Sequence, residues 1–192
     1  MNDGTDNDDL QNALQVLRKG GVIVYPTDTV WGVGCDATNA AAVKRIFEIK
    51  KRSDSKAMIS LVSDVDMLSK YVECIPEAAY QLMDVAVDPL TIIYDHPWGI
   101  VSELKAEDGS AAFRVTSDTF ARGLCRGLRR PLVSTSANIS GEKSPVSFGS
   151  ISAEILGQVD YIVKTRRESI AGVKPSTVIK ISDGNVIKII RE

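Results

Sequence analysis

The stretch GGVIVYPTDTVWGVGCDATNAAAVKRIFEIKKRSDSKAMISLV, residues 20–62, indicates the fold most strongly. The β-branched run at 22–25 predicts a buried strand. Pro26 ends that strand, because proline has no N–H to donate within a sheet. A helix follows, with Thr38 or Asn39 as its N-cap. The apolar run at 57–62 predicts another strand, so strands and helices alternate as in an α/β protein.

Polar residues gather at two points of this stretch. Thr27, Asp28 and Thr29 lie just beyond the carboxyl end of the first strand, and the helix ends in the cations Lys50, Lys51, Arg52 and Lys56. Such groups at the end of a strand suit an anionic ligand. Ordinary turn residues, and cations that interact favourably with a helix C-terminus, explain them equally well. The spacing alone favours this simpler interpretation.

The composition is that of an ordinary globular protein, with 44% apolar and 25% charged residues in a chain of 192. This length suits one domain with a substantial core. We therefore expect a flexible N-terminus at 1–8, which is acidic and polar, and a single domain at 9–192. The net charge of −2 argues against a general nucleic-acid binder. The absence of a long apolar run and of CxxC patterns predicts a cytoplasmic protein with reduced cysteines, not a membrane protein.

The remaining chain continues the alternation. Apolar, β-branched runs predict strands at 90–94, 111–115, 131–135 and 161–163, and two further runs around Asp183-Gly184 predict a terminal hairpin. Helical patterns fall at 10–17, 77–85, 117–128 and 150–156, and residues 95–109 are predicted to form a mobile surface loop. Because a hairpin is antiparallel, we expect a mixed sheet with helices on both faces.

The chain lacks the usual signatures of several enzyme classes. It has neither GxxxxGK[ST] nor GxGxxG, its one histidine is His96, and no cluster suggests a metal site. Arg114 lies in an apolar strand, where a buried guanidinium needs an anionic partner. A site of cations, hydroxyls and amides is suited to positioning and charge stabilisation, as in nucleotidyl or phosphoryl transfer.

Six motifs, in order from about residue 10 to 191, resemble the YrdC family: PTDTVWGVGCDA, IKKR with Lys56 close behind, FRV, STSANISGEKSP, PSTVIKI and IIR. The resemblance implies a three-layer α/β (α+β) fold around a twisted mixed sheet with a concave cavity. It also implies the synthesis of L-threonylcarbamoyl-AMP and pyrophosphate from L-threonine, bicarbonate and ATP, with magnesium. The product supplies the threonylcarbamoyl group of the adenosine next to the anticodon in tRNA, so tRNA or the downstream transferase machinery are implied partners.

The resemblance also assigns residues. The K-x-R motif falls on Lys50 and Arg52, which it implies are catalytic. The implied ATP site comprises Lys50, Arg52, Lys56, Ser110, Ser136, Asn138, Ser144 and Arg191. The implied threonine site comprises Thr29, Leu61, Arg114, Ser134 and Ser176. In that site Arg114 would pair with the threonine carboxylate, which suits a bidentate guanidinium.

The chain departs from the family pattern at four places. Ser53 replaces a proline after the K-x-R motif, residues 85–89 lack a Trp-Pro-Gly-Pro turn, Trp31 replaces a common tyrosine, and Leu61 stands where the family has histidine. Two alternatives therefore stay open beside the synthase: an RNA-binding module, and a nucleotide-binding paralogue with a different amino-acid substrate. Threonine-dependent conversion of ATP to pyrophosphate separates the synthase from both.

Overall fold

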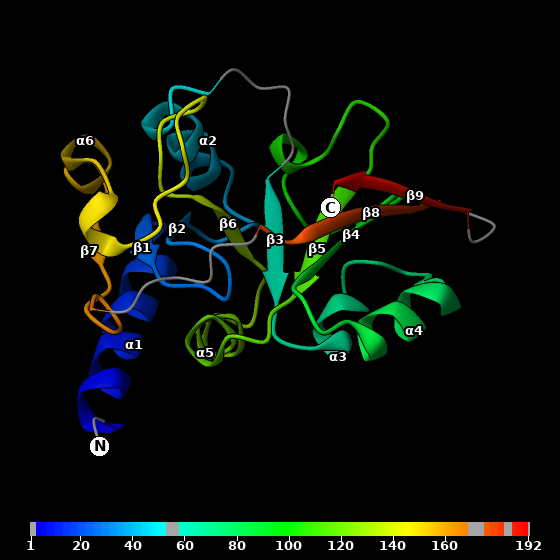
Figure 1. Cartoon of the computed structure of the whole chain (residues 1–192), viewed down its shortest axis with the longest axis horizontal. Helices are drawn as coiled ribbons and strands as arrows, with labels where there is room; N and C mark the ends of the chain where they lie inside the picture. The colour runs from blue at the N-terminus through cyan, green and yellow to red at the C-terminus, as the bar shows by residue number, and fades with distance from the viewer. Residues whose placement is uncertain (1–2, 53–57, 169–174, 183–185, 192) are drawn as a thin grey trace.

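The computed structural model describes residues 3–52, 58–168, 175–182 and 186–191, and shows helices packed around one sheet (Figure 1). The helices, including the 3-10 helices η1 and η2, are α1 Asp3–Arg18, α2 Ala40–Ile49, α3 Val65–Leu68, α4 Glu77–Val85, η1 Ser102–Leu104, α5 Thr119–Leu128, η2 Phe148–Ser150 and α6 Ala153–Leu156. The strands are β1 Ile23–Tyr25, β2 Gly32–Gly34, β3 Ile59–Val62, β4 Leu90–Tyr94, β5 Ala111–Val115, β6 Leu132–Ser136, β7 Tyr161–Ile162, β8 Thr177–Ser182 and β9 Val186–Arg191.

The strands form one sheet in the order β7-β1-β2-β6-β3-β5-β4-β8-β9. The pairs β1–β7, β3–β5 and β4–β8 are parallel, whereas β1–β2, β2–β6, β3–β6, β4–β5 and β8–β9 are antiparallel. The predicted mixed sheet is thus confirmed, and so is the antiparallel pairing of the terminal hairpin. The predicted turn residues Asp183 and Gly184 lie outside the described residues.

Helices cover both faces of the sheet, as predicted. Figure 1 shows α2 on one side and α1, α3 and α5 on the other. Helix α1 packs closely on α5. The contact leaves no room for a side chain at Gly127, where a Cβ would lie 2.4 Å from Leu14 Cδ1. The core between these layers is apolar, with Leu14, Leu17, Val43, Ile46 and Leu124 at most 2% exposed. The three layers hold the sheet that carries the polar side chains described below.

The predicted elements agree closely with the structure at most positions. Strands β4 and β5 and helix α4 have the predicted bounds, and Asn39 caps α2 by accepting a hydrogen bond from the N–H of Ala42. Strand β2 was not predicted, because its glycines give no strand pattern. Gly34 is required there, since a Cβ would lie 2.4 Å from the carbonyl oxygen of Val133. The helix predicted at 150–156 is shorter, because Ser152 caps a new helix, α6.

The N-terminal residues differ from the prediction. Helix α1 begins at Asp3, so residues 3–8, predicted to be a flexible terminus, belong to this helix. The carboxylate of Asp6 fixes this end of the helix, because it accepts a hydrogen bond from the Thr165 hydroxyl at 3.0 Å. Residues 95–109, predicted to be a surface loop, contain η1 and place Ile100 and Leu104 in the core.

Candidate functional site

A pocket of about 240 Å³ opens where β1, β3, β5, β6 and β8 bring polar side chains together. We call it the arginine pocket, because three of its lining residues are arginines: Arg52, Arg114 and Arg191. Its other lining residues are Thr27, Thr29, Val30, Gly32, Met58, Ile59, Ser134, Thr135, Ser136, Ser144, Pro175 and Ser176. Eight of the predicted site residues therefore line one pocket: Thr29, Arg52, Arg114, Ser134, Ser136, Ser144, Ser176 and Arg191.

The turn after β1 is fixed by its own hydroxyl groups. The Thr27 hydroxyl donates to the carbonyl oxygen of Val30 at 2.7 Å and accepts from the N–H of Thr29 at 3.0 Å. The hydroxyls of Thr27 and Thr29 are 3.0 Å apart. These bonds satisfy a tight turn of threonines at the carboxyl end of a buried strand. The turn thereby presents Thr29 to the pocket in a fixed orientation.

Arg114 is the most deeply buried cation of the pocket. It lies on β5 and is 4% exposed. Its Nη2 is 3.0 Å from Oδ1 of Asp28, the residue between the two threonines. Within the described residues, Arg114 Nε has no hydrogen-bond partner. The guanidinium is therefore held by one carboxylate and keeps donor capacity for a second ligand.

Ser176 and Arg191 form one network at the other wall. Arg191 Nη2 donates to the carbonyl oxygen of Ser176 at 2.8 Å, and the Ser176 hydroxyl is 2.8 Å from the Thr91 hydroxyl. Arg191 is an exposed residue, and this network ties its guanidinium to the wall of the pocket. Sequence analysis did not assign Thr91 to the site. In the sequence, Thr91 differs from its neighbours as a polar residue within an apolar run. The structure shows that it is fully buried.

Lys50 is placed differently from the prediction, which put it against ATP. Its side chain is 2% exposed and does not line the arginine pocket. Nζ donates to the carbonyl oxygens of Ser136 and, at 2.7 Å, Asn138, and the Lys50 carbonyl oxygen accepts from the N–H of Ser140 at 2.9 Å. Lys50 thus holds both the end of β6, where Ser136 lines the pocket, and the loop that follows this strand.

The environment of Lys50 lowers its pKa to about 8, because burial and the nearby Arg52 guanidinium disfavour the charged form. Between about pH 8 and pH 10.5 the unfolded chain binds a proton at Lys50 that the folded protein has released. The contribution of Lys50 to the free energy of unfolding therefore increases with pH across this window.

We expect the difference in unfolding free energy between the wild type and Lys50→Met to grow from pH 8 to pH 10, by at most about 1.4 kcal/mol per pH unit. Urea unfolding at the two pH values measures it, and comparison with the variant cancels the titration of other groups. An equal difference at both pH values would contradict a lowered pKa for Lys50.

Two further predicted residues, Asn138 and Ser110, do not line the arginine pocket. Asn138 supports the loop after β6, since its Nδ2 donates to the carbonyl oxygens of Ile139 and Glu142 at 2.8 and 2.9 Å. Ser110 is buried beside β5 and its hydroxyl donates to Asp108 at 2.6 Å, so it does not line the arginine pocket. Lys56 lies outside the described residues. Arg52 lines the arginine pocket and also a second, larger cavity beside α2 and η1. Burial lowers the pKa of its guanidinium.

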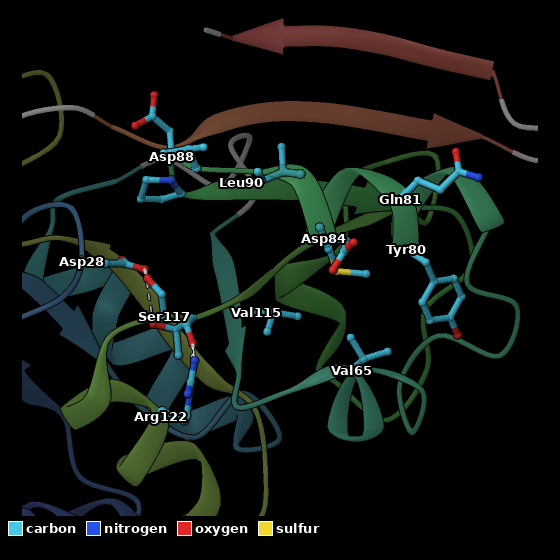
Figure 2. A pocket seen from close by; sticks show the side chains of 15 residues that line it. Asp28, Val65, Tyr80, Gln81, Asp84, Asp88, Leu90, Val115, Ser117 and Arg122 are labelled. Atoms are coloured by element: carbon cyan, nitrogen blue, oxygen red, sulfur yellow. Dashed lines mark hydrogen bonds between the residues drawn. The ribbon is translucent and has the colours of Figure 1, made fainter.

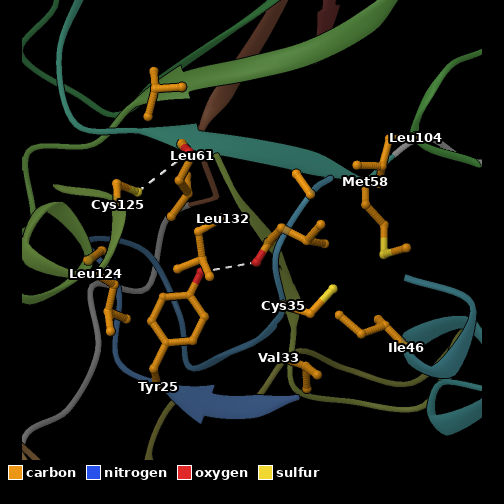
Figure 3. Close-up of a cluster of buried hydrophobic side chains, with 14 of the residues drawn as sticks. Tyr25, Val33, Cys35, Ile46, Met58, Leu61, Leu104, Leu124, Cys125 and Leu132 are labelled. Carbon is orange, nitrogen blue, oxygen red and sulfur yellow. Dashed lines mark hydrogen bonds between the residues drawn. The ribbon is translucent and has the colours of Figure 1, made fainter. Parts of the chain in front are cut away.

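The structure corrects the prediction for Leu61, which was expected to contact threonine. Its side chain is 0% exposed and does not line the arginine pocket. Figure 3 shows it among apolar core residues, and its carbonyl oxygen accepts from the thiol of Cys125 at 3.4 Å. An aliphatic side chain is favoured in this position because it buries no unsatisfied polar group. A ligand in the pocket has no access to it.

Comparisons with known proteins identify the family of this chain. The family model described as telomere recombination (Sua5, YciO and YrdC) matches residues 15–192. The chain belongs to the Sua5/YciO/YrdC family. A family member from Xanthomonas euvesicatoria pv. vesicatoria, named threonylcarbamoyl-AMP synthase, is 33% identical over 187 residues, which cover 96% of this chain and 99% of the relative. A second, from Xanthomonas axonopodis pv. citri, has the same name, identity and coverage.

Solved structures of the Sua5/YciO/YrdC family share the fold. The structure of E. coli YciO is 29% identical, has a TM-score of 0.83, and matches 97% of this chain and 89% of its own. The structure of P. abyssi Sua5 complexed with L-threonine is 29% identical, has a TM-score of 0.79, and matches 89% of this chain and 50% of its own. These likenesses confirm the predicted family and the predicted mixed α/β fold.

Among the described residues, none of the helices has the length and apolar character of a membrane span. In the same part of the chain, no three histidine, cysteine, aspartate or glutamate side chains come together as metal ligands.

Proposed function

We propose that this protein is an L-threonylcarbamoyladenylate synthase, which makes threonylcarbamoyl-AMP and pyrophosphate from L-threonine, bicarbonate and ATP. One observation carries the proposal: three arginines and a set of serine and threonine hydroxyls line one small pocket, with no carboxylate among its described lining residues. Such a pocket suits a substrate with several anionic groups, because each arginine can bind a carboxylate or phosphate through two donors. The names of the Xanthomonas relatives support the same activity.

The amino acid binds at the Arg114 side of the pocket. Arg114 receives the threonine carboxylate, since its guanidinium has donor capacity beyond the ion pair with Asp28. Thr29, Ser134 and Ser176 also line this pocket and offer hydroxyl groups to the amine and the side chain. The threonine complex of P. abyssi Sua5 supports this class of substrate.

The nucleotide binds at the Arg52 side. Arg52 and Arg191 neutralise its phosphates, and the hydroxyls of Ser136 and Ser144 donate to them. Lys50 and Asn138 act through the loop that they hold, and Lys56 and Ser110 stay proposed ATP contacts. Magnesium would accompany ATP and would neutralise negative charge on its phosphates.

The chemistry needs no protein nucleophile. Bicarbonate and the neutral amine of threonine condense to a carbamate with loss of water. A carbamate oxygen then attacks the α-phosphorus of ATP, and the bond to the bridging oxygen breaks to release pyrophosphate. The pocket contributes orientation and stabilisation of the developing negative charge, which are the main sources of catalysis in such transfers. We propose that the product serves tRNA modification through a downstream transferase.

One observation keeps the paralogue with another amino-acid substrate as a second candidate. Leu61 occupies the position where the family carries histidine. Its side chain lies in the core, so this position presents no side chain to the amino-acid substrate. A different amino acid would bind through the same Arg114 contact and differ only in its side chain. Comparison of threonine with serine, alanine and valine as substrates separates the two candidates.

We expect pyrophosphate release from ATP to require both L-threonine and bicarbonate. Serine should react more weakly, because one methyl group in a pocket is worth about 1–3 kcal/mol. A coupled pyrophosphate assay, with each substrate omitted in turn, measures this dependence. Equal release without any amino acid would refute the synthase, and faster release with another amino acid would favour the paralogue.

A further inference from the structure

The ion pair between Asp28 and Arg114 is unusual in its burial. The two side chains are 10% and 3% exposed. In the other ion pairs found within the described residues, at least one side chain is more than 20% exposed. Burying an ion pair removes both charges from water, and this desolvation cost can exceed the free energy gained from their attraction. Its retention beside the arginine pocket therefore calls for a role in the site.

The two partners face different spaces. Arg114 lines the arginine pocket, whereas Asp28 does not. Asp28 lines a second cavity of about 660 Å³, which we call the α4–α5 cavity (Figure 2). There its Oδ2 accepts long hydrogen bonds from the hydroxyls of Thr116 and Ser117, both at 3.4 Å. Asp28 thus holds the guanidinium from behind, and a ligand reaches Arg114 from the other side.

This arrangement makes the substrate carboxylate and Asp28 share one cation. Asp28 fixes the position of Arg114 and also neutralises part of its charge. A second carboxylate on the same guanidinium is attracted by Arg114 and repelled by Asp28, because like charges at short range in a poorly solvated site disfavour one another. The internal carboxylate therefore sets how tightly the pocket binds an external one.

We propose that Asp28 is a positioning residue, an internal counter-ion of Arg114 that competes with the carboxylate of the amino-acid substrate. The inference rests on the proposed function, because it takes a free amino acid as the ligand of Arg114. The ion pair with Asp28 keeps Arg114 neutralised and oriented when the pocket is empty. It also lowers the affinity of the pocket for threonine.

Asp28→Asn tests the proposal, because asparagine keeps the shape and the acceptor oxygen but removes the charge. We expect the variant to melt at a lower temperature without ligand, since Arg114 then lacks a counter-ion. We expect it to bind L-threonine on the order of tenfold more tightly than the wild type, and threonine to raise its melting temperature by more. Calorimetry and thermal melting measure both effects.

Two controls isolate the shared charge. L-Threoninamide lacks the carboxylate, so its affinity should not rise in Asp28→Asn. Asp36→Asn makes the same change in another buried carboxylate, whose Oδ2 lies 2.7 Å from Arg130 outside the arginine pocket. This control should lose stability without any change in threonine affinity, as a purely structural aspartate would.

The outcomes separate the inference from the proposed function. Wild-type protein that binds no threonine would overturn both. Wild-type binding with an equal or weaker affinity in Asp28→Asn would overturn the role of Asp28 alone. If the variant is unfolded in buffer, threonine should restore a cooperative melt where threoninamide does not, and failure of threonine to do so would also overturn the proposal.

Discussion

Arg52→Ala is expected to lose about thirty- to thousandfold in the rate of threonylcarbamoyl-AMP formation, with a nearly unchanged melting temperature. Arg52 lies just beyond the end of α2 and lines the arginine pocket. A charge-assisted contact to the phosphates at the reacting centre is worth roughly 2–4 kcal/mol in the transition state. A cation that only complements a helix end contributes about 0.3–1 kcal/mol to stability. The rate and the melting temperature therefore report different roles.

Arg126→Ala is the matched control for Arg52→Ala. Arg126 is also an arginine at the end of a helix, in the last turn of α5, and it does not line the pocket. Its variant should keep the wild-type rate. A normal rate in Arg52→Ala would remove Arg52 from the site, and a large fall in its melting temperature would make it a structural residue.

Leu61→His is expected to destabilise the protein by about 2–4 kcal/mol without tightening threonine binding. The imidazole would replace a fully buried leucine in an apolar cluster and leave polar nitrogens without partners (Figure 3). From the sequence alone, a histidine at this position is predicted to face the amino acid. The buried position of Leu61 predicts the opposite outcome.

Leu61→Met controls for the loss of leucine, since a volume-conserving apolar change costs less than about 1.5 kcal/mol. Chemical denaturation gives the stability of both variants, and calorimetry gives their affinity for threonine. A stable Leu61→His that binds threonine more tightly than the wild type would show that this side chain reaches the ligand.

Local patterns were sufficient for most of the fold. The bounds of β4, β5 and α4 follow from runs of apolar residues that end at proline, glycine or a cap, so each is decided within a few residues. Strand β2 could not be predicted in this way, because its glycines are required by contacts with other strands. A side chain at Gly34 would collide with Val133 and Tyr25, and only the folded sheet brings these residues near.

The candidate site shows the same division. The resemblance to a family identified eight residues that the fold gathers around one pocket, but it could not tell which side chains face the pocket. Lys50 turns toward the carbonyl oxygens of the loop after β6, and Leu61 turns into the core. The pairing of Arg114 with Asp28 joins residues 86 positions apart in the sequence, so no local pattern could have predicted it.

If a threonine carbamate attacks ATP, the carbon of bicarbonate becomes part of the adenylated product, and the mass of that product reveals it. The protein is incubated with ATP, magnesium, L-threonine and carbon-13 bicarbonate, and the nucleotides are analysed by mass spectrometry. We expect threonylcarbamoyl-AMP that retains one labelled carbon and disappears when threonine is omitted. Unlabelled threonyl-AMP, or AMP as the only adenylate in complete mixtures, would contradict it.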